Sequence, residues 1–236
     1  MRLFLTGVGS GLGKALALEA LKRGYEVYAL GRRLPEELKG RVRFERCDLR
    51  AHERIPTAVE RLLSGVDGLE LAVLNAGVLG ELKDLRETAL FEMQEVFSVN
   101  LWAAKVVTDE LLRVTRVETV VAVSSGAARN CNRGWGAYAM SKAALNCLMS
   151  LYAKELPGTH FVAYAPGLVL TPMLEKVLSS DAERFPSVER IRRSVKLTPE
   201  QAAELFFEAL RYLKEAPSGS FVDVRELPVF EEFLRS

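Results

Sequence analysis

Two side chains that can carry acid–base chemistry lie four residues apart in a segment of helical period, Tyr138 and Lys142. On a helix this spacing places the phenol and the ammonium on one face, so they can act at one site. Ser125, thirteen residues before Tyr138, ends a run of buried β-type residues and adds a hydroxyl. A Tyr and a Lys at this spacing also occur on ordinary helix surfaces. Inside one site, however, the ammonium lowers the pKa of the phenol, which favours proton transfer.

A glycine-rich turn lies near the N-terminus, in residues 4–14 (FLTGVGSGLGK). The turn joins a strand to a helix, and the backbone amides of a helix N-terminus attract a pyrophosphate. Gly7 permits the tight turn, Gly11 lets the backbone approach the phosphates, and Gly13 lets the helix pack on the strand. A plain structural turn is the alternative. The strand before it and the helix after it favour a dinucleotide site.

The end of the second expected strand indicates which dinucleotide. A site specific for NAD places a carboxylate there to accept a hydrogen bond from the ribose 2′-hydroxyl. This sequence instead has Arg32 and Arg33 at that point, with no acidic residue. A guanidinium offers paired donors to a 2′-phosphate, so Arg32, with Arg33 as a helper, predicts NADP(H). A solvated basic turn is the alternative interpretation.

The elements that must position these residues alternate along the chain. Short β-type runs are expected at Leu3–Thr6, Glu26–Leu30, Arg41–Cys47, Leu69–Leu74, Val117–Val123, His160–Ala165 and Ser220–Val224. Segments of helical period are expected at Leu12–Arg23, Ala51–Leu63, Thr88–Arg113, Gly136–Glu155 and Thr198–Glu215, the last with Thr198 as N-cap. This alternation predicts an α/β fold: a Rossmann-type, doubly wound parallel sheet of about seven strands with helices on both faces.

The domain organisation follows from the connections between these elements. Most are short, and there is no repeat or low-complexity tract, so residues 1–236 are expected to form one dinucleotide-binding domain. The exception is the segment of residues 171–197, which reads as a substrate flap over one end of the sheet.

Composition excludes several other classes of function. The chain has 32 Lys and Arg against 31 Asp and Glu, so no bulk field attracts nucleic acid or a membrane surface. No apolar run approaches the roughly 20 residues of a membrane span. Cys47, Cys131 and Cys147 form no metal-ligand spacing and have only His52 and His160 as partners, so no metal site is expected. The odd number of cysteines predicts reduced thiols and a cytoplasmic location.

The spacing T-G-x-x-x-G-x-G resembles the short-chain dehydrogenase/reductase family, and the resemblance extends over essentially the whole chain. It implies that Ser125 holds the substrate carbonyl oxygen, that Tyr138 delivers the proton, and that Lys142 binds the nicotinamide ribose and tunes Tyr138. Asn100 corresponds to the family's helix-kinking asparagine, which extends a water relay to the lysine. From the residues alone, Asn100 is a polar group at a helical bend.

The same resemblance implies the cofactor site. Asp48 and Leu49 match the adenine cradle, residues 75–77 match the family's N-A-G, and Val169 would meet the carboxamide through its backbone, with a hydroxyl added by Thr171. The full set of expected cofactor contacts is Thr6, Gly7, Ser10, Gly11, Leu12, Gly13, Arg32, Arg33, Asp48, Leu49, Asn75, Ala76, Gly77, Tyr138, Lys142, Pro166, Gly167, Val169 and Thr171.

Segments 124–128, 134–138 and 218–224 resemble the sepiapterin reductase and benzil reductase subgroup, whose members reduce pteridine side-chain carbonyls and vicinal diketones with NADPH. This implies a substrate site of Ser125, Trp135 and Asp223, in which the Asp223 carboxylate anchors a pterin ring. The alternatives are that Asp223 forms a surface ion pair and that Trp135 is a packing aromatic.

The expected function is therefore NADPH-dependent reduction of a ketone or vicinal diketone, with a small-molecule carbonyl compound as partner. A 3-oxoacyl thioester reductase of the same family is the alternative, although the chain lacks the Gly-Gly terminus of those enzymes. A regulator that senses NADP without chemistry should have lost Ser125, Tyr138 or Lys142. The family resemblance implies a homodimer or homotetramer through the segments 88–113 and 136–155. The alternative is that apolar residues there, such as Leu145, Leu148 and Leu151, serve only the core.

Overall fold

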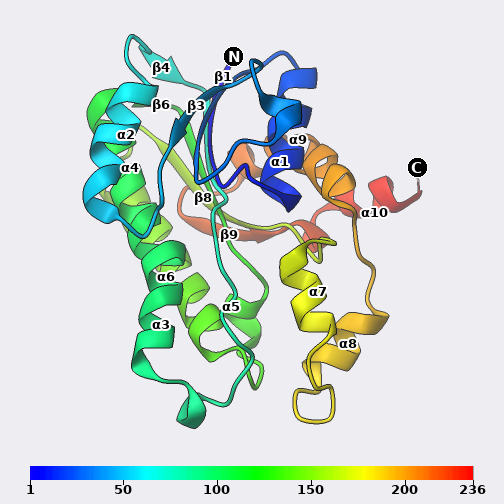
Figure 1. The fold of residues 1–236 in the computed structure, drawn as a ribbon. Helices are drawn as coiled ribbons and strands as arrows, with labels where there is room; N and C mark the ends of the chain where they lie inside the picture. The colour runs from blue at the N-terminus through cyan, green and yellow to red at the C-terminus, as the bar shows by residue number, and fades with distance from the viewer. Residues whose placement is uncertain (236) are drawn as a thin grey trace.

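The computed structural model describes residues 1–235 and is built on a central sheet of seven parallel strands in the order β3-β2-β1-β5-β7-β8-β9 (Figure 1). These strands are β1 (Arg2–Thr6), β2 (Glu26–Gly31), β3 (Arg43–Arg46), β5 (Leu71–Leu74), β7 (Thr119–Val123), β8 (His160–Ala165) and β9 (Ser220–Asp223). Strand order reverses between β1 and β5, as in a doubly wound sheet. The predicted fold class is confirmed.

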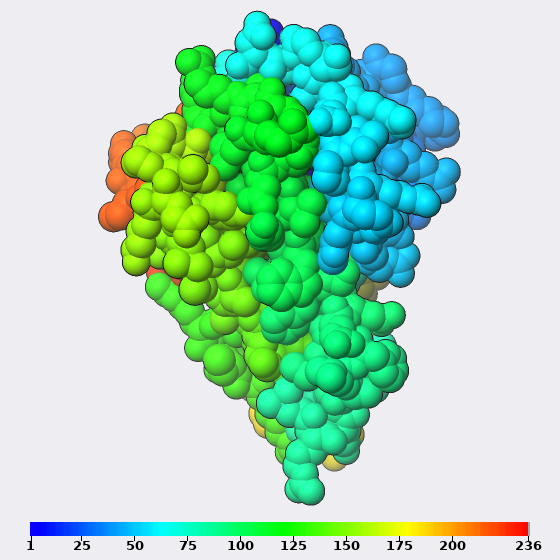
Figure 2. Space-filling model, turned by 90° about the vertical axis from the view of Figure 1, so that its left-hand side faces the viewer, coloured from blue at the N-terminus to red at the C-terminus, as the bar shows by residue number. Residues whose placement is uncertain are grey.

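Helices cover both faces of this sheet (Figure 1). One layer comprises α1 (Gly11–Lys22), α9 (Pro199–Glu215) and α10 (Pro228–Arg235), and the other comprises α2 (Ile55–Leu62), α4 (Ala103–Val114) and α6 (Gly136–Glu155). The helices at the carboxyl end of the strands are α3 (Leu90–Phe97), α5 (Ala127–Asn130), α7 (Pro172–Leu178) and α8 (Ser187–Arg193). Figure 2 looks onto the layer of α2, α4 and α6, which tapers toward that end of the molecule.

Both faces of the sheet are buried, because consecutive residues of a strand point into different cores. In β1, Leu3 and Leu5 pack into the core beneath α1 and α9, whereas Phe4 packs into the core beneath α2 and α4. All five residues of β7 are buried. The central strands are therefore rigid supports, and the loops that follow them carry the polar side chains.

Two of the predicted strands are interrupted, which is a correction to the expected boundaries. Leu69–Leu74 divides into β4 (Gly68–Leu69) and β5, and Val117–Val123 divides into β6 (Arg116–Val117) and β7. The pieces β4 and β6 pair with each other in a separate two-stranded parallel sheet. At the first break the Glu70 carboxylate accepts a hydrogen bond from the backbone N–H of Arg2, which ends the regular pairing of β5.

The predicted helix Thr88–Arg113 is also not continuous. A 3₁₀ turn, η3 (Leu85–Glu87), precedes α3, and a π-helical segment, η4 (Ser98–Trp102), separates α3 from α4. Asn100 lies in η4, and its side-chain amide bonds to the backbone of Val78 on a neighbouring loop. A π-helical turn commonly marks a functional site, because the extra residue redirects a side chain. The bend predicted at Asn100 is confirmed.

Other differences from the expected elements are small. Ala51–Leu63 begins as a 3₁₀ turn, η2 (His52–Arg54), before α2, and the expected strand Arg41–Cys47 is shorter in β3. Further 3₁₀ turns form at η1 (Glu36–Leu38) and η5 (Val224–Glu226), and the short helices α5 and α10 were not anticipated. The N-cap predicted at Thr198 is confirmed, because its hydroxyl accepts from the N–H of Gln201 at 3.2 Å.

The segment 171–197 forms α7 and α8 and lies at the carboxyl end of the sheet (Figure 1). Its two ends are tied together, because the N–H of Leu197 donates to Leu168 and the N–H of Leu170 donates to Leu197, at 2.9 and 2.8 Å. None of the helices within residues 1–235 is long and apolar enough to cross a membrane.

Candidate active site

The glycine-rich turn between β1 and α1 is packed so closely that side chains are excluded at three positions. Gly7 has φ +78°, and a Cβ there would lie 2.9 Å from the Cα of Ala76. Gly11 has φ +54°, and a Cβ there would meet the Thr171 methyl at 2.9 Å. At Gly13 a Cβ would lie 2.1 Å from the carbonyl oxygen of Gly7. Gly13 thus lets α1 approach the turn itself.

The loop after β5 holds this turn in place through hydrogen bonds. The side-chain amide of Asn75 donates to the carbonyl oxygens of Thr6 and Gly7 at 3.1 and 3.2 Å, and the Thr6 hydroxyl accepts from the N–H of Ala76 at 3.1 Å. Because these bonds join the carboxyl ends of β1 and β5, they fix the floor of the crevice where the strand order reverses. Ligands of doubly wound sheets bind in this crevice.

Two guanidinium groups lie at the end of β2, and neither forms an ion pair with another residue in the described chain. Arg32 and Arg33 are both exposed, and the side chain of Arg33 lies against Gly9, with Nε 3.1 Å from the position of a Cβ there. The nearby Asp48 carboxylate instead accepts hydrogen bonds from the Arg50 guanidinium, which lowers the pKa of Asp48 to about 2.

The loop after β8 contains backbone groups that form no hydrogen bond in the described chain. Leu197 forms backbone hydrogen bonds with Leu168 and Leu170, the residues on each side of Val169. The N–H and C=O of Val169 itself form no hydrogen bond in the described chain. Val169 is buried, and Thr171 caps α7 and touches Gly11. A carboxamide would supply the donor and acceptor that this backbone lacks. The segment 171–197 therefore begins at the cofactor crevice.

Tyr138 and Lys142 meet beside the end of β7, as their spacing predicts. The Lys142 ammonium is buried, donates to the carbonyl oxygen of Val123 at 2.7 Å, and lies 5.8 Å from the centroid of the Tyr138 ring. Burial lowers the pKa of Lys142 to about 8. Burial raises the pKa of the Tyr138 hydroxyl, and a hydrogen bond with Ser125 opposes that shift. Ser125 thus lies close enough to Tyr138 to influence the pKa of its hydroxyl.

Asn100 connects this pair to the neighbouring loop. Its amide accepts from the N–H of Val78 at 2.8 Å, donates to the carbonyl of Val78 at 2.9 Å, and donates to the Ser141 hydroxyl at 3.0 Å. Ser141 in turn donates to the carbonyl oxygen of Tyr138 at 2.8 Å. Sequence reasoning missed Val78 and Ser141, although Ser141 lies between Tyr138 and Lys142 in the same motif.

Gly77 marks the point where these groups converge. A Cβ on Gly77 would lie 3.3 Å from the Asn100 side-chain oxygen and 3.4 Å from the Lys142 nitrogen. The structure therefore brings Ser125, Tyr138, Lys142 and Asn100 together at one place, next to the glycine-rich turn.

The other predicted cofactor residues lie on the same loops. Ser10 is the N-cap of α1, Leu12 packs at the edge of the core beneath α1, Leu49 is buried after β3, and Pro166 and Gly167 follow β8.

Trp135 faces the flap. Its indole N–H donates to the Ser187 hydroxyl at 2.9 Å, and its ring centroid lies 6.0 Å from that of Tyr138. The Phe185 ring covers Gly134, where a Cβ would lie 2.6 Å from it. Trp135 therefore joins the helix that carries Tyr138 to the segment over the substrate side, and it belongs to a third apolar cluster there. Its contact with a substrate stays a prediction.

Charged side chains hold the same segment from outside. Asp84 accepts two hydrogen bonds from Arg133, both at 2.7 Å, and one from Arg184 at 3.0 Å, and Arg184 also contacts Glu87. These two arginines lower the pKa of Asp84, that of Arg133 having the larger effect. The flap is thereby attached to the loop before α3.

Asp223 ends β9 with its carboxylate buried, and it forms an ion pair with Arg225. Nε and Nη2 of Arg225 donate to the two carboxylate oxygens at 2.8 and 2.5 Å, and its backbone N–H donates at 3.1 Å. The ion pair foreseen as an alternative is present, with the Asp223 carboxylate buried and the Arg225 guanidinium exposed. Anchoring of a pterin ring by Asp223 stays a prediction.

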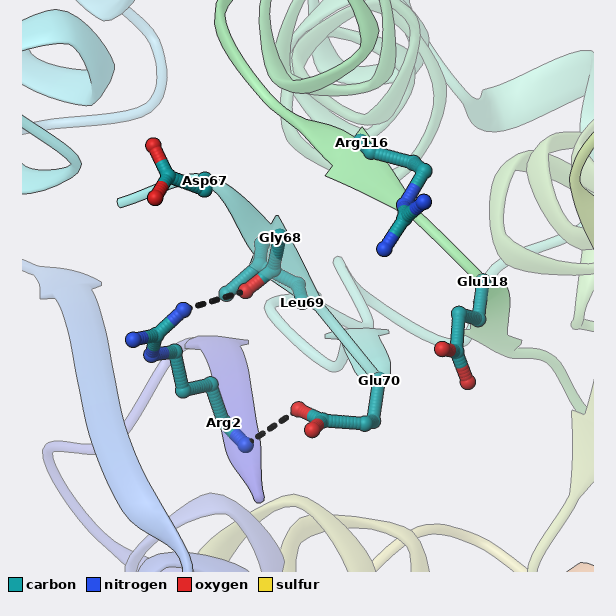
Figure 3. A pocket seen from close by; sticks show the side chains of 7 residues that line it. All are labelled: Arg2, Asp67, Gly68, Leu69, Glu70, Arg116 and Glu118. Carbon is teal, nitrogen blue, oxygen red and sulfur yellow. Dashed lines mark hydrogen bonds between the residues drawn. The ribbon is translucent and has the colours of Figure 1, made fainter. Parts of the chain in front are cut away.

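A second hollow lies at the opposite end of the sheet (Figure 3). It has a volume of about 150 Å³ and is lined by Arg2, Asp67, Gly68, Leu69, Glu70, Arg116 and Glu118. These residues surround the small sheet of β4 and β6, at the amino ends of the parallel strands. It is separate from the carboxyl-end crevice, where Tyr138 and the glycine-rich turn lie.

Comparisons with known proteins agree with this geometry. A family model described as short chain dehydrogenase matches residues 2–182. A benzil reductase ((S)-benzoin forming) of Bacillus subtilis is 31% identical, covering 94% of this chain and 97% of the relative. A sepiapterin reductase of Mus musculus is 29% identical, covering 80% of this chain and 82% of the relative. A Beutenbergia cavernae structure with bound NADP is 27% identical, with a TM-score of 0.78 and 94% of each chain covered.

Proposed function

This chain belongs to the short chain dehydrogenase family, and we propose that it is an NADPH-dependent reductase of a ketone or vicinal diketone, with Tyr138 as proton donor. One observation carries the proposal: Lys142 is buried beside the Tyr138 ring, with Ser125 close to Tyr138 and the glycine-rich turn next to them. A buried ammonium that makes no ion pair is costly in a purely structural role.

The residues present fit a dinucleotide. Gly7 and Gly11 leave the crevice floor without side chains, and the unpaired backbone of Val169 matches a carboxamide. Arg32 and Arg33 have no acidic partner in the described chain and would hold a 2′-phosphate, which favours NADP over NAD. A similar protein carries NADP in its solved structure. When bound, the cofactor supplies hydride to the carbonyl carbon.

The chain's own residues act on the oxygen. Ser125 and Tyr138 donate hydrogen bonds to the carbonyl oxygen, where negative charge develops, and Tyr138 then transfers its proton. Lys142 would hold the nicotinamide ribose and, as a cation, would favour the phenolate that remains on Tyr138. Asn100 and Ser141 fix the first turn of α6 through the Tyr138 carbonyl, so both act as positioning residues.

The substrate class is supported by the names of the similar proteins, a benzil reductase and a sepiapterin reductase. Both substrates carry a ketone next to another carbonyl or ring acceptor. A 3-oxoacyl thioester is the second candidate, since its ketone lies two carbons from a thioester carbonyl.

A substrate panel tests the proposal. Oxidation of NADPH followed at 25 °C against benzil, sepiapterin, diacetyl and an acetoacetyl thioester should give the highest kcat/KM with one of the first three. A highest value with the thioester would select the alternative. A protein that binds NADPH and reduces none of the four would favour the regulator that senses NADP without chemistry.

A pH profile tests the role of Lys142. Its pKa of about 8 lies below its ordinary value of 10.5, so the ammonium is lost as pH rises through about 8. The raised pKa of Tyr138 keeps its hydroxyl protonated over the same range. We expect kcat/KM for reduction to be constant below about pH 7 and to fall about tenfold per pH unit above pH 8.

The matched control is Lys142→Arg, whose guanidinium stays charged. Its activity should be lower, but the fall above pH 8 should disappear. An unchanged alkaline limb in Lys142→Arg would assign that limb to another group.

The assembly and the location of the protein stay predictions. Trp102 and Leu151 are 52% and 49% exposed, next to α4 and on α6, the helices predicted to form a homodimer or homotetramer. Figure 2 shows this face. All three cysteines are free.

A further inference from the structure

Arg225, which no motif singled out, lies against Gly126, the residue after the proposed catalytic Ser125. It follows β9 in the turn η5, and its Nη2 is 2.9 Å from the position that a Cβ on Gly126 would occupy. Gly126 directly follows Ser125. The aliphatic part of Arg225 crosses Gly167, 3.7 Å from a Cβ there. The guanidinium therefore lies between the loops after β7 and β8, where glycines leave room for it.

The guanidinium is held in place and still has donors to offer. Asp223 accepts from Nε and from one N–H of Nη2, and it is buried, so the plane of the group is fixed. A guanidinium has five N–H donors, which leaves both N–H of Nη1 and one of Nη2. Nη1 makes no hydrogen bond within residues 1–235, and the Arg225 side chain is 44% exposed. A fixed, accessible donor next to Ser125 can bind an acceptor on the substrate.

The charges around Arg225 indicate which kind of acceptor. Asp223 neutralises Arg225, and the adjacent Glu226 pairs with Arg129 at 3.0 Å, so this corner carries no net charge. A neutral corner gives little attraction for a carboxylate, whereas its free N–H groups suit a carbonyl oxygen. Both Asp223 oxygens already accept from Arg225, so the group presented to the substrate is a donor.

We propose that Arg225 binds the second oxygen of a neutral dicarbonyl substrate while Ser125 and Tyr138 bind the oxygen that is reduced. Asp223 then acts as a positioning residue for Arg225. This inference rests on the proposed function and deepens it, because it selects dicarbonyl compounds over monoketones of the same size.

The test compares two substrates that differ by one oxygen. Benzil and deoxybenzoin each carry two phenyl groups, but deoxybenzoin has a methylene in place of the second carbonyl. We expect Arg225→Met to lower kcat/KM for benzil about ten- to a hundredfold and that for deoxybenzoin less than about threefold, because only benzil loses a charge-assisted bond. Arg129→Met is the matched control, since Arg129 pairs with the next acid of η5, and it should change neither value.

A double variant guards against misfolding, because Arg225→Met alone leaves Asp223 buried and unpaired. Asp223→Asn/Arg225→Met removes both charges and should show the same selective loss for benzil, with an unchanged Kd for NADPH. Equal losses for both substrates, or no loss for either, would overturn the role proposed for Arg225 but not the proposed function. A wild-type protein that binds NADPH but reduces neither compound would overturn the proposed function, and this inference with it.

Discussion

Tyr138→Phe should lower kcat for carbonyl reduction by about 10²- to 10⁴-fold while the Kd for NADPH stays nearly unchanged. The substitution removes only the hydroxyl that donates the proton and bonds to Ser125. The ring keeps its volume and its contact with Trp135, whose centroid lies 6.0 Å away. Single-turnover absorbance at 340 nm with saturating NADPH would measure the chemical step.

Tyr152→Phe is the matched control for this prediction. Tyr152 lies on the same helix, but its hydroxyl bonds to the Lys105 carbonyl and to Asp109, away from the crevice. Its loss should leave kcat within about twofold. Turnover by Tyr138→Phe close to that of the wild type would contradict the assigned mechanism, because the variant has no phenol hydroxyl beside Lys142 to donate the proton.

Local patterns predicted the fold because the alternation of strands and helices is set by residues close in sequence. The breaks within predicted strands could not be read in this way. Glu70 lies at the break between β4 and β5, and its carboxylate accepts a hydrogen bond from Arg2, which is 68 residues away. The π-helical turn likewise involves Asn100 reaching Val78, a contact between a helical segment and a distant loop. Hydrophobic period alone does not report such contacts.

The candidate site likewise has a part that the sequence predicts and a part that only the structure shows. Tyr138, Lys142 and the glycines belong to short motifs, so their placement was predictable, and the structure brings them together. The contacts that shape the substrate side join distant residues. Arg184 reaches Asp84 from 100 positions along the chain. No motif connects Arg225 with Gly126, so only the structure shows that the Arg225 side chain lies against Gly126.

Cofactor preference should reverse in Arg32→Asp. We expect the wild type to have a higher kcat/KM with NADPH than with NADH, and the variant to change this ratio by about 10²-fold or more. The substitution removes donors to the 2′-phosphate and adds a carboxylate that repels it but accepts from a 2′-hydroxyl. Neither Arg32 nor Arg33 is neutralised by an ion pair in the described chain, so either charge is available to a phosphate.

The roles of Arg32 and Arg33 in cofactor binding can be distinguished, because the two side chains lie at different positions. Arg33 lies over Gly9, beside the turn that would hold the pyrophosphate, so Arg33→Asp should weaken both NADPH and NADH. Arg32→Asp should weaken NADPH alone, and Arg86→Asp, an exposed arginine on the remote turn η3, should weaken neither. Fluorescence titration of the wild type and the three variants with both cofactors gives, for each of the four proteins, the ratio of the Kd for NADPH to the Kd for NADH. A wild type that already prefers NADH, or an Arg32→Asp variant that loses both cofactors equally, would show that the end of β2 does not recognise a 2′-phosphate.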